Sequence, residues 1–302
     1  MHAAAPANSP RGSQALASLP AALLPWGRGW MAALACVLEA SAPKPGNVHP
    51  GAAFDDLCYD DLVAAALAIA PVMDRAAAVP LGRTILDAVA ATRRVVRSNA
   101  NLGIVLALAP LAAARPPGPV RAADAAAALD RLTADDARLV WEAIAIARPG
   151  GMGGSGKWDV AGPAPPDLLE AMRLAAPRDA LARLWAEGYA PLFAGPVPDL
   201  AADLAAGFGL DDAIVRCHLR QLARTPDTLI ARRHGPDVAA DVSARAAAVI
   251  VAPGEMWREA AARFDASLRR PVRINPGTTA DLVAAALYIL LADGTLRPHL
   301  GC

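Results

Sequence analysis

Residues 281–292 read DLVAAALYILLA, and this stretch is the strongest indication of the fold. Its large apolar residues point in every direction around a helix rather than along one face: Leu282, Val283, Leu287, Tyr288, Ile289, Leu290 and Leu291. A helix that is apolar all round is stable in water only when other elements surround it. We therefore expect residues 281–292 to form a central helix that the rest of the chain encloses.

The rest of the chain also follows helical patterns, and the alternation typical of strands is almost absent. Helical spacing recurs over residues 30–40, 62–70, 81–98, 135–147, 166–176, 178–190, 199–206, 211–224, 237–252 and 254–269. The sequence therefore predicts an all-α fold, with a single compact multi-helix domain over residues 28–302. An Ala- and Pro-rich stretch over residues 1–27 predicts a disordered tail. The Gly- and Pro-rich residues 150–166 predict a long functional loop rather than a domain linker.

Capping residues mark several of the expected helix boundaries. Thr133 followed by Asp136 is a variant of the capping box, which begins a helix. Pro226 suits the first position of a short helix, because its missing N–H is not needed there. We expect the last helix to begin at Asp281, and Pro71 to end or kink the helix over residues 62–70.

Composition limits the classes of partner. The chain has 302 residues, with 29 basic and 29 acidic side chains, so its formal net charge is zero and gives no support for nucleic-acid or anionic-membrane binding. No uninterrupted apolar run reaches the ~18 residues typical of a membrane span. The four cysteines lack metal-type spacing. We expect a cytoplasmic protein that acts on small molecules, with no nucleic-acid or membrane partner, and leave open whether it is a homodimer.

A polar loop follows the first expected helix. Residues 38–51 read LEASAPKPGNVHPG, and they bring a carboxylate (Glu39), an ammonium (Lys44), an amide (Asn47) and an imidazole (His49) close together in the sequence. The prolines and glycines forbid a continued helix and restrict the backbone. A rigid loop just beyond a helix end is a good place to fix polar groups for chemistry.

Lysine and asparagine are rare in this chain, and their positions are informative. Only two of the 29 basic residues are lysines, and Asn47, Asn99, Asn101 and Asn275 are four of only five asparagines. One interpretation is that asparagine remains where turns and helix caps favour it. The other is that a site needs a neutral amide that aspartate cannot replace. Because these four lie in three Gly- or Pro-marked segments, the clustering favours the second interpretation.

Four polar clusters lie at expected helix ends: residues 44–49, 99–101, 227–232 and 275–281. Helix N-termini present free N–H groups and partial positive charge, which suits phosphate. Carboxylates bind Mg²⁺, which in turn holds a triphosphate. Lys44 and Arg232 would neutralise phosphate oxygens, and the asparagines would orient sugar hydroxyls. We expect these clusters to meet at one nucleotide pocket.

These clusters, in this order, resemble the triphosphoribosyl-dephospho-CoA synthase family over roughly residues 30–292. The matching stretches are Pro43-Lys44-Pro45-Gly46-Asn47-Val48, Asn99-Ala100-Asn101-Leu102-Gly103, Pro226-Asp227-Thr228 with Arg232-Arg233-His234-Gly235, and Asn275-Pro276-Gly277-Thr278-Thr279-Ala280-Asp281-Leu282. The resemblance implies an all-helical enzyme that uses ATP with Mg²⁺. A hydroxyl of the acceptor attacks C1′ of the ATP ribose, adenine leaves, and the 5′-triphosphate stays on the transferred sugar. In the family the acceptor is the 2′-hydroxyl of dephospho-CoA, and the product is a prosthetic-group precursor for an acyl carrier protein.

The resemblance and the chemistry together give a set of expected site residues. Displacement at an anomeric carbon passes through an oxocarbenium-like state that a carboxylate stabilises, and the acceptor hydroxyl needs a base. The expected catalytic residues are Glu39, Lys44, Asp56, Asp227 and Asp281. The expected substrate-binding residues are Asn47, His49, Asn99, Asn101, Thr228, Arg232, Asn275, Gly277 and Thr278. The expected magnesium ligands are Asp55, Asp56 and Asp281. The sequence does not divide the catalytic roles among these carboxylates.

The chain departs from the family pattern at two places. Asn101 and Leu102 stand where typical members carry His and Lys, and Ala53 stands where they carry His. The lost cationic contacts suggest a different acceptor, as in a divergent branch of the kind met in the one-carbon metabolism of methylotrophs and methanogens. A pterin-linked polyol, such as a tetrahydromethanopterin precursor, would suit the same chemistry. A Mg²⁺-dependent hydrolase of ribosyl-nucleotide bonds and a non-catalytic helical scaffold are the competing interpretations.

Overall fold

The computed structural model describes residues 27–114, 119–148, 158 and 162–297. These residues form α-helices, two isolated bridges in tight turns, and no strand. The predicted all-α fold is therefore confirmed. The predicted tail before residue 27 and the Gly-rich residues 150–157 lie outside the described part of the chain.

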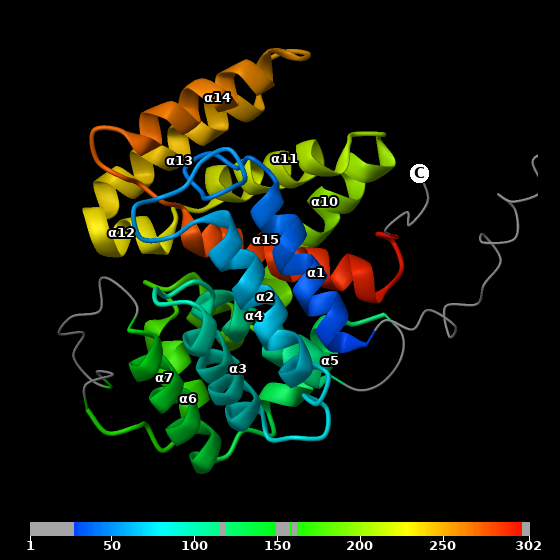
Figure 1. Cartoon of the computed structure of the whole chain (residues 1–302), viewed down its shortest axis with the longest axis vertical. Helices are drawn as coiled ribbons and strands as arrows, with labels where there is room; N and C mark the ends of the chain where they lie inside the picture. Colours follow the sequence, from blue (N-terminus) through cyan, green and yellow to red (C-terminus); the bar gives the residue numbers. More distant parts are fainter. Residues whose placement is uncertain (1–26, 115–118, 149–157, 159–161, 298–302) are drawn as a thin grey trace, which may run out of the picture.

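In chain order the helices are α1 (Arg28–Ser41), α2 (Tyr59–Met73), α3 (Leu81–Val95), α4 (Leu102–Ala113), α5 (Ala122–Leu129), α6 (Ala134–Ala147), α7 (Leu168–Ala175), α8 (Ala180–Ala186), α9 (Ala190–Ala194), α10 (Pro196–Ala205), α11 (Leu210–Arg224), α12 (Thr228–His234), α13 (Pro236–Ile250), α14 (Met256–Arg269) and α15 (Gly277–Ala292). In Figure 1, α12, α13 and α14 lie at one end of the molecule and α3, α6 and α7 at the other, with α15 crossing between them.

Helix α15 is central, as the sequence predicts. Every residue from Leu282 to Leu291 is buried, and α1, α4, α10, α11 and α12 pack against this helix. Helix α4 is enclosed in the same way, since all of its residues except Gly103 are buried. Because α4 and α15 are apolar all round, each is stable only inside the bundle. The two helices contact each other and form the centre of the fold.

Several helix boundaries differ from the prediction. Helix α15 begins at Gly277, one turn before the expected start at Asp281. Helix α12 begins at Thr228 with Asp227 as its N-cap, so Pro226 lies before the helix. Helix α2 continues through Pro71 to Met73. The short helices α5 and α9 were not predicted. The capping box at the start of α6 is confirmed, with the hydroxyl of Thr133 accepting from the N–H of Asp136 at 3.2 Å.

A proline inside α4 explains two buried aromatic residues. Pro110 has no N–H, so the carbonyl of Leu106 one turn earlier loses its helical donor. The indole of Trp185 donates to this carbonyl at 3.0 Å. The hydroxyl of Tyr189 donates to the carbonyl of Ala107 at 2.8 Å. Helix α8 and the N-cap residue of α9 thus satisfy backbone carbonyls of α4 and fix this helix in place.

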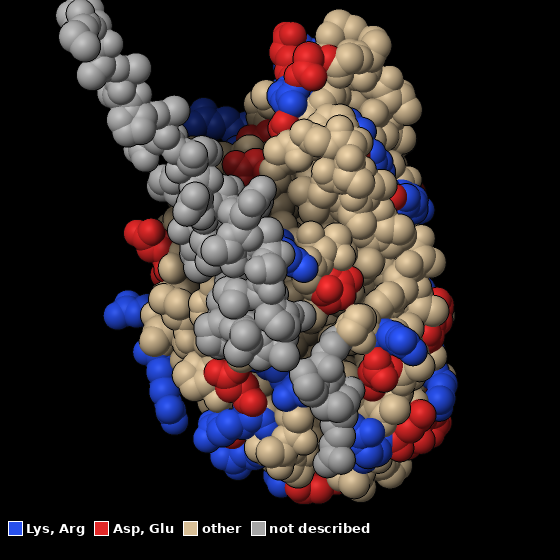
Figure 2. All heavy atoms as spheres, turned by 90° about the vertical axis from the view of Figure 1, so that its right-hand side faces the viewer, with Lys and Arg blue, Asp and Glu red and all other residues tan. Residues whose placement is uncertain are grey.

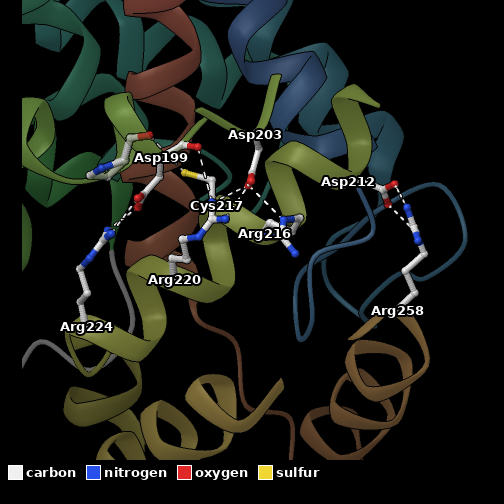
Figure 3. Close-up of polar contacts among 9 residues, drawn as sticks. Asp199, Asp203, Asp212, Arg216, Cys217, Arg220, Arg224 and Arg258 are labelled. Carbon is white, nitrogen blue, oxygen red and sulfur yellow. Dashed lines mark hydrogen bonds and ion pairs between the residues drawn. The ribbon is translucent and has the colours of Figure 1, made fainter. Parts of the chain in front are cut away.

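Arginine–aspartate pairs join the outer helices (Figure 3). Asp203 of α10 is only 4% exposed, and it accepts from Arg216 at 3.2 Å and from Arg220 at 2.8 Å, both on α11. Arg258 of α14 donates to Asp212 of α11 at 3.2 Å. Charged hydrogen bonds of this kind are geometrically specific. They set how α10 and α14 lie on α11.

The molecular surface carries mixed charge. Figure 2 shows basic and acidic side chains interspersed on one face, with broad uncharged areas between them. This agrees with the formal net charge of zero. Among the helices of the described residues, none combines the length and the apolar character that crossing a membrane would require.

Candidate functional site

A pocket lies where the N-termini of α4 and α15 approach the end of α1. Seven of the predicted site residues line it: Glu39, Asn47, Asn99, Asn101, Asn275, Gly277 and Asp281. Its volume is about 140 Å³. This is smaller than the roughly 300–1,000 Å³ of pockets that enclose a drug-sized ligand, so it would enclose only part of a nucleotide. Residues of three of the four polar clusters thus line one pocket, and nucleotide binding there stays a prediction.

A buried ion pair fixes one wall of this pocket. Lys44 is fully buried, and its ammonium contacts Oε1 of Glu39 at 2.9 Å. The same ammonium donates to the carbonyl of Ala42 at 3.2 Å and to the carbonyl of Glu39. All three donors of the ammonium are thereby used. Lys44 holds the Glu39 carboxylate at the pocket and caps the C-terminus of α1. Lys44 itself does not line the pocket, so the expected phosphate contact would require this ion pair to open.

Helix α14 clamps the loop that follows Lys44. The N–H of Gly46 donates to Oδ1 of Asp265 at 2.8 Å, and Arg269 donates to the carbonyl of Asn47 at 2.6 Å. Gly46 has φ 79°, where a side chain is strained, and a Cβ there would lie 2.8 Å from the carbonyl oxygen of Ile274. The clamp therefore requires glycine and places Asn47 on the pocket wall. Asp265 and Arg269 were not predicted, because nothing in their own sequence marks them as partners of so distant a loop.

Two amides present unpaired polar atoms to the pocket. Asn47 donates to Oδ1 of Asn275 at 2.7 Å, but its own Oδ1 has no partner among the described residues. Nδ2 of Asn101 also has no partner there. Both side chains are more than nine-tenths buried. A buried unpaired polar atom costs free energy, so these amides indicate a ligand with hydroxyl or ring-nitrogen groups. Asn99 is exposed, and its Oδ1 accepts from the N–H of Leu102 at 3.2 Å, which caps α4.

Asp281 also lines the pocket, in the second turn of α15. Its carboxylate rests against Gly103, where a Cβ would lie 1.9 Å from Oδ2. No described residue donates a hydrogen bond to Asp281 or forms an ion pair with it. Burial, followed by the charges of Glu39 and Asp227, raises the pKa of Asp281 well above its usual value. The pocket thus has one carboxylate that is paired with lysine and one that is unpaired.

Asp227 connects two helices rather than lining the pocket. Its Oδ1 accepts from the N–H groups of Leu229 and Ile230 at 2.9 and 3.0 Å, which caps α12. Its Oδ2 accepts from the N–H and the hydroxyl of Thr279 at 2.8 Å each, which satisfies the first turn of α15. This cap from another helix explains why α15 begins one turn earlier than its own sequence suggests. Three of the four hydrogen bonds that Asp227 accepts come from backbone N–H groups and the fourth comes from the Thr279 hydroxyl, and a catalytic role for Asp227 stays a prediction.

Three further predicted binding residues lie behind the pocket wall. The hydroxyl of Thr228 donates to that of Thr278 at 3.3 Å, and Thr278 is buried. Arg232 donates to Asp179 at 2.7 Å, and its charge lies near enough to Asp281 to oppose the rise in pKa of that carboxyl. None of the three lines the pocket. Substrate contacts for them stay predictions.

Comparisons with known proteins identify the family of this chain. A family model described as CitG, ATP:dephospho-CoA triphosphoribosyl transferase, matches residues 26–298. The chain belongs to this family. It is accordingly a transferase, as the sequence predicts. Among solved structures, it is similar to an Archaeoglobus fulgidus protein described as a "putative triphosphoribosyl-dephospho-coA synthase". The two are 24% identical with a TM-score of 0.61, over 78% of this chain and 100% of that chain, which shows a shared fold. Among curated proteins there is no match.

The sequence predicts Asp55, Asp56 and Asp281 as magnesium ligands, and the structure does not group these three carboxylates. Asp55 and Asp56 lie exposed at the tip of a tight turn between Phe54 and Leu57, and Asp56 pairs with Arg273. Within the described ranges no three acidic, histidine or cysteine side chains are grouped to hold a metal. Magnesium commonly uses one or two carboxylates together with substrate phosphates.

The carboxylates of Glu39 and Asp281, which face the same pocket, fit this substrate-dependent arrangement of magnesium ligands. His49 does not belong to this group. It lies in the neighbouring turn, where its Nδ1 accepts from the N–H of Gly51 at 3.2 Å. A role for His49 in substrate binding stays a prediction.

His218 of α11 lies behind the Lys44 loop, and sequence reasoning gave it no role. It is fully buried, and neither ring nitrogen makes a well-aligned hydrogen bond, although the carbonyl of Pro45 is near. Burial, followed by the charge of Lys44, lowers the pKa of His218 to about 3. The imidazole is therefore neutral and supports the loop by packing. The sequence around an isolated histidine in a helical pattern does not indicate that its side chain packs behind a distant loop.

Proposed function

We propose that this enzyme transfers the triphosphoribosyl unit of ATP to a hydroxyl of an acceptor, with release of adenine. The observation that supports this most directly is the pocket itself. It combines two carboxylates with two buried amides that each have one polar atom without a partner among the described residues, at the N-termini of two central helices. Amides of this kind suit the hydroxyls of a ribose, and carboxylates suit a reaction that develops positive charge at C1′.

The chemistry requires one bond to break and one to form. The bond between C1′ and the adenine nitrogen breaks with its electron pair going to adenine, and the acceptor oxygen forms a new bond to C1′. The acceptor hydroxyl loses a proton and the departing adenine gains one. Glu39 and Asp281 are the two carboxylates on the pocket wall that can stabilise the oxocarbenium-like state and take up the proton.

Lys44 supports these steps without touching the substrate. Its ion pair fixes the Glu39 carboxylate in one orientation, which is the positioning that catalysis at a single carbon requires. The N-termini of α4 and α15 make the pocket electrostatically more positive and favour an anionic nucleotide there. When bound, Mg²⁺ would be held by Glu39 and Asp281 and would neutralise phosphate charge.

The first candidate acceptor is the 2′-hydroxyl of dephospho-CoA, because the family acts on it. A second candidate is a pterin-linked polyol of the tetrahydromethanopterin-precursor type. The observation that favours it is that Asn101 and Leu102 both line the pocket. These are the two positions where typical family members carry His and Lys, so the departure from the family falls on the site itself.

The test is incubation with ATP and Mg²⁺ and either acceptor, with free adenine measured by chromatography. We expect adenine only when an acceptor is present. Adenine formed equally without acceptor would instead support the hydrolase, and the absence of ATP binding would support a non-catalytic scaffold. The variant Asp281→Asn keeps the shape of the side chain and should slow adenine release by about 100-fold. Asp293→Asn, at the exposed end of the same helix, is the matched control and should keep the rate.

A further inference from the structure

Two arginines lie at the edge of the pocket, and no role was predicted for either. The guanidinium of Arg273 lies 4.6 Å from the centre of the Phe54 ring, and Phe54 lines the pocket. Arg233, in the last turn of α12, is exposed. We call Arg233 and Arg273 the arginine rim. It stands on the residues just before α15 and on the end of α12, on the side of the pocket that Phe54 forms.

The arginine rim holds more positive charge than the described residues neutralise, because Asp56 is the one carboxylate that pairs with it. Arg233 has no hydrogen bond or ion pair with any described residue. Partial burial, followed by the charges of Arg273 and Arg232, lowers its pKa, so these like charges lie close to one another. Asp56 pairs with Arg273, and it is the carboxylate whose charge also reaches Arg233. Like charges held together cost free energy unless an anion joins them.

Several arginines elsewhere in the fold have carboxylate partners on a neighbouring helix. Figure 3 shows this for α10, α11 and α14, where Asp203 receives two arginines and Arg224 pairs with Asp199 through contacts that include one of 2.7 Å. Those pairs hold helices together. Arg233 does not join two helices, because no acceptor among the described residues bonds to its side chain. Structural pairing therefore does not account for Arg233.

We propose that Arg233 and Arg273 bind phosphate oxygens of a substrate whose sugar occupies the pocket. The pocket volume of about 140 Å³ leaves the rest of a nucleotide outside, and the arginine rim lies where that part would emerge. A guanidinium offers a planar fork of donors that matches phosphate. Asp56 is then a competitor, which occupies Arg273 until a phosphate replaces it. The inference rests on the proposed function only for the identity of the substrate, since both ATP and dephospho-CoA carry phosphates.

The experiment measures binding by calorimetry and needs no turnover, so it stands apart from the test of the proposed function. The probes are inorganic tripolyphosphate, ATP and dephospho-CoA. The variants are Arg233→Gln and Arg273→Gln, with Arg270→Gln as the matched control, because Arg270 is exposed and nearby in sequence. Asp56→Asn is the informative fourth variant, because it removes the competitor and keeps the shape.

We expect each rim variant to weaken tripolyphosphate binding by about 10-fold, the usual size for one charged hydrogen-bonding contact, and Asp56→Asn to strengthen it. Parallel weakening for ATP assigns the rim to the donor's triphosphate, and weakening for dephospho-CoA alone assigns it to the acceptor. If the Asp56–Arg273 pair only stabilises the loop, Asp56→Asn and Arg273→Gln will shift binding in the same direction, which overturns the proposal. Unchanged binding of all three probes in both rim variants also overturns it.

Discussion

Replacing Lys44 by methionine should destabilise the protein strongly. The variant keeps the length of the side chain and removes the ammonium. Glu39, which is 5% exposed, would then hold a buried carboxylate without its partner at 2.9 Å. The carbonyls of Ala42 and Glu39 would also lose a donor. Breaking a buried pair by removing one partner costs about 3–5 kcal/mol, a large fraction of the roughly 5–15 kcal/mol that stabilises a typical domain.

The free energy of unfolding is measured by urea titration followed by circular dichroism. The double variant Lys44→Met with Glu39→Gln removes the stranded charge, so it should be more stable than Lys44→Met alone. Arg83→Met is the control, because Arg83 pairs with Asp87 on the surface at 2.9 Å, and such pairs contribute about 0–1 kcal/mol. If Lys44→Met costs no more than Arg83→Met, the ion pair does not hold the pocket wall and the reasoning is wrong.

Three further predictions follow from single contacts. Gly103→Ala should abolish measurable ATP binding in calorimetry, because the new Cβ would meet the Asp281 carboxylate at 1.9 Å; unchanged binding would place the nucleotide elsewhere. Asp227→Ala should cost about 2–4 kcal/mol in urea unfolding, since it removes the cap of α12 and both contacts to Thr279; a cost below that of an ordinary exposed cap, about 1 kcal/mol, would refute the link between α12 and α15. His218, with its pKa near 3, stays unprotonated when folded, whereas the unfolded chain takes up a proton below about pH 6.5. Between about pH 6 and pH 4 the wild type should therefore lose up to about 1.4 kcal/mol per pH unit more than His218→Leu, and equal slopes in the two proteins would contradict this.

The fold was largely predictable because the helix at its centre consists almost entirely of apolar residues. An apolar helix such as residues 281–292 has no stable place except the interior, and the absence of alternating patterns excluded strands. The start of α15 was not predictable from its own sequence. The carboxylate that accepts from the N–H group of Thr279 in its first turn belongs to Asp227, the N-cap of α12. The sequence predicts that Pro71 ends or kinks the helix, and α2 continues through it to Met73. A proline near the end of a helix removes only one bond, and packing of the remaining residues outweighs it.

The pocket was predictable in part. The asparagines stood out because the chain contains so few, and the structure places four of them at or beside one pocket. The prediction that Asp55 and Asp56 bind magnesium with Asp281 was wrong. The two residues follow the polar loop in the sequence, but they lie exposed at the tip of a turn. Lys44 was correctly singled out as unusual, but whether it faces a ligand or a helix end depends on contacts that only the folded chain supplies. The contacts that Asp265 and Arg269 make with the loop could not be predicted, because nothing in the loop sequence indicates which distant residues bind it.

The central claim is that this pocket breaks the bond between ATP ribose and adenine while the phosphates stay on the sugar. The most direct measurement uses ATP labelled in its ribose and in its terminal phosphate, incubated with Mg²⁺ and dephospho-CoA, with the products separated and weighed by mass spectrometry. The account predicts free adenine in equal amount to an acceptor adduct that carries both labels. Release of labelled phosphate or of ADP, with adenine still attached to ribose, would contradict it.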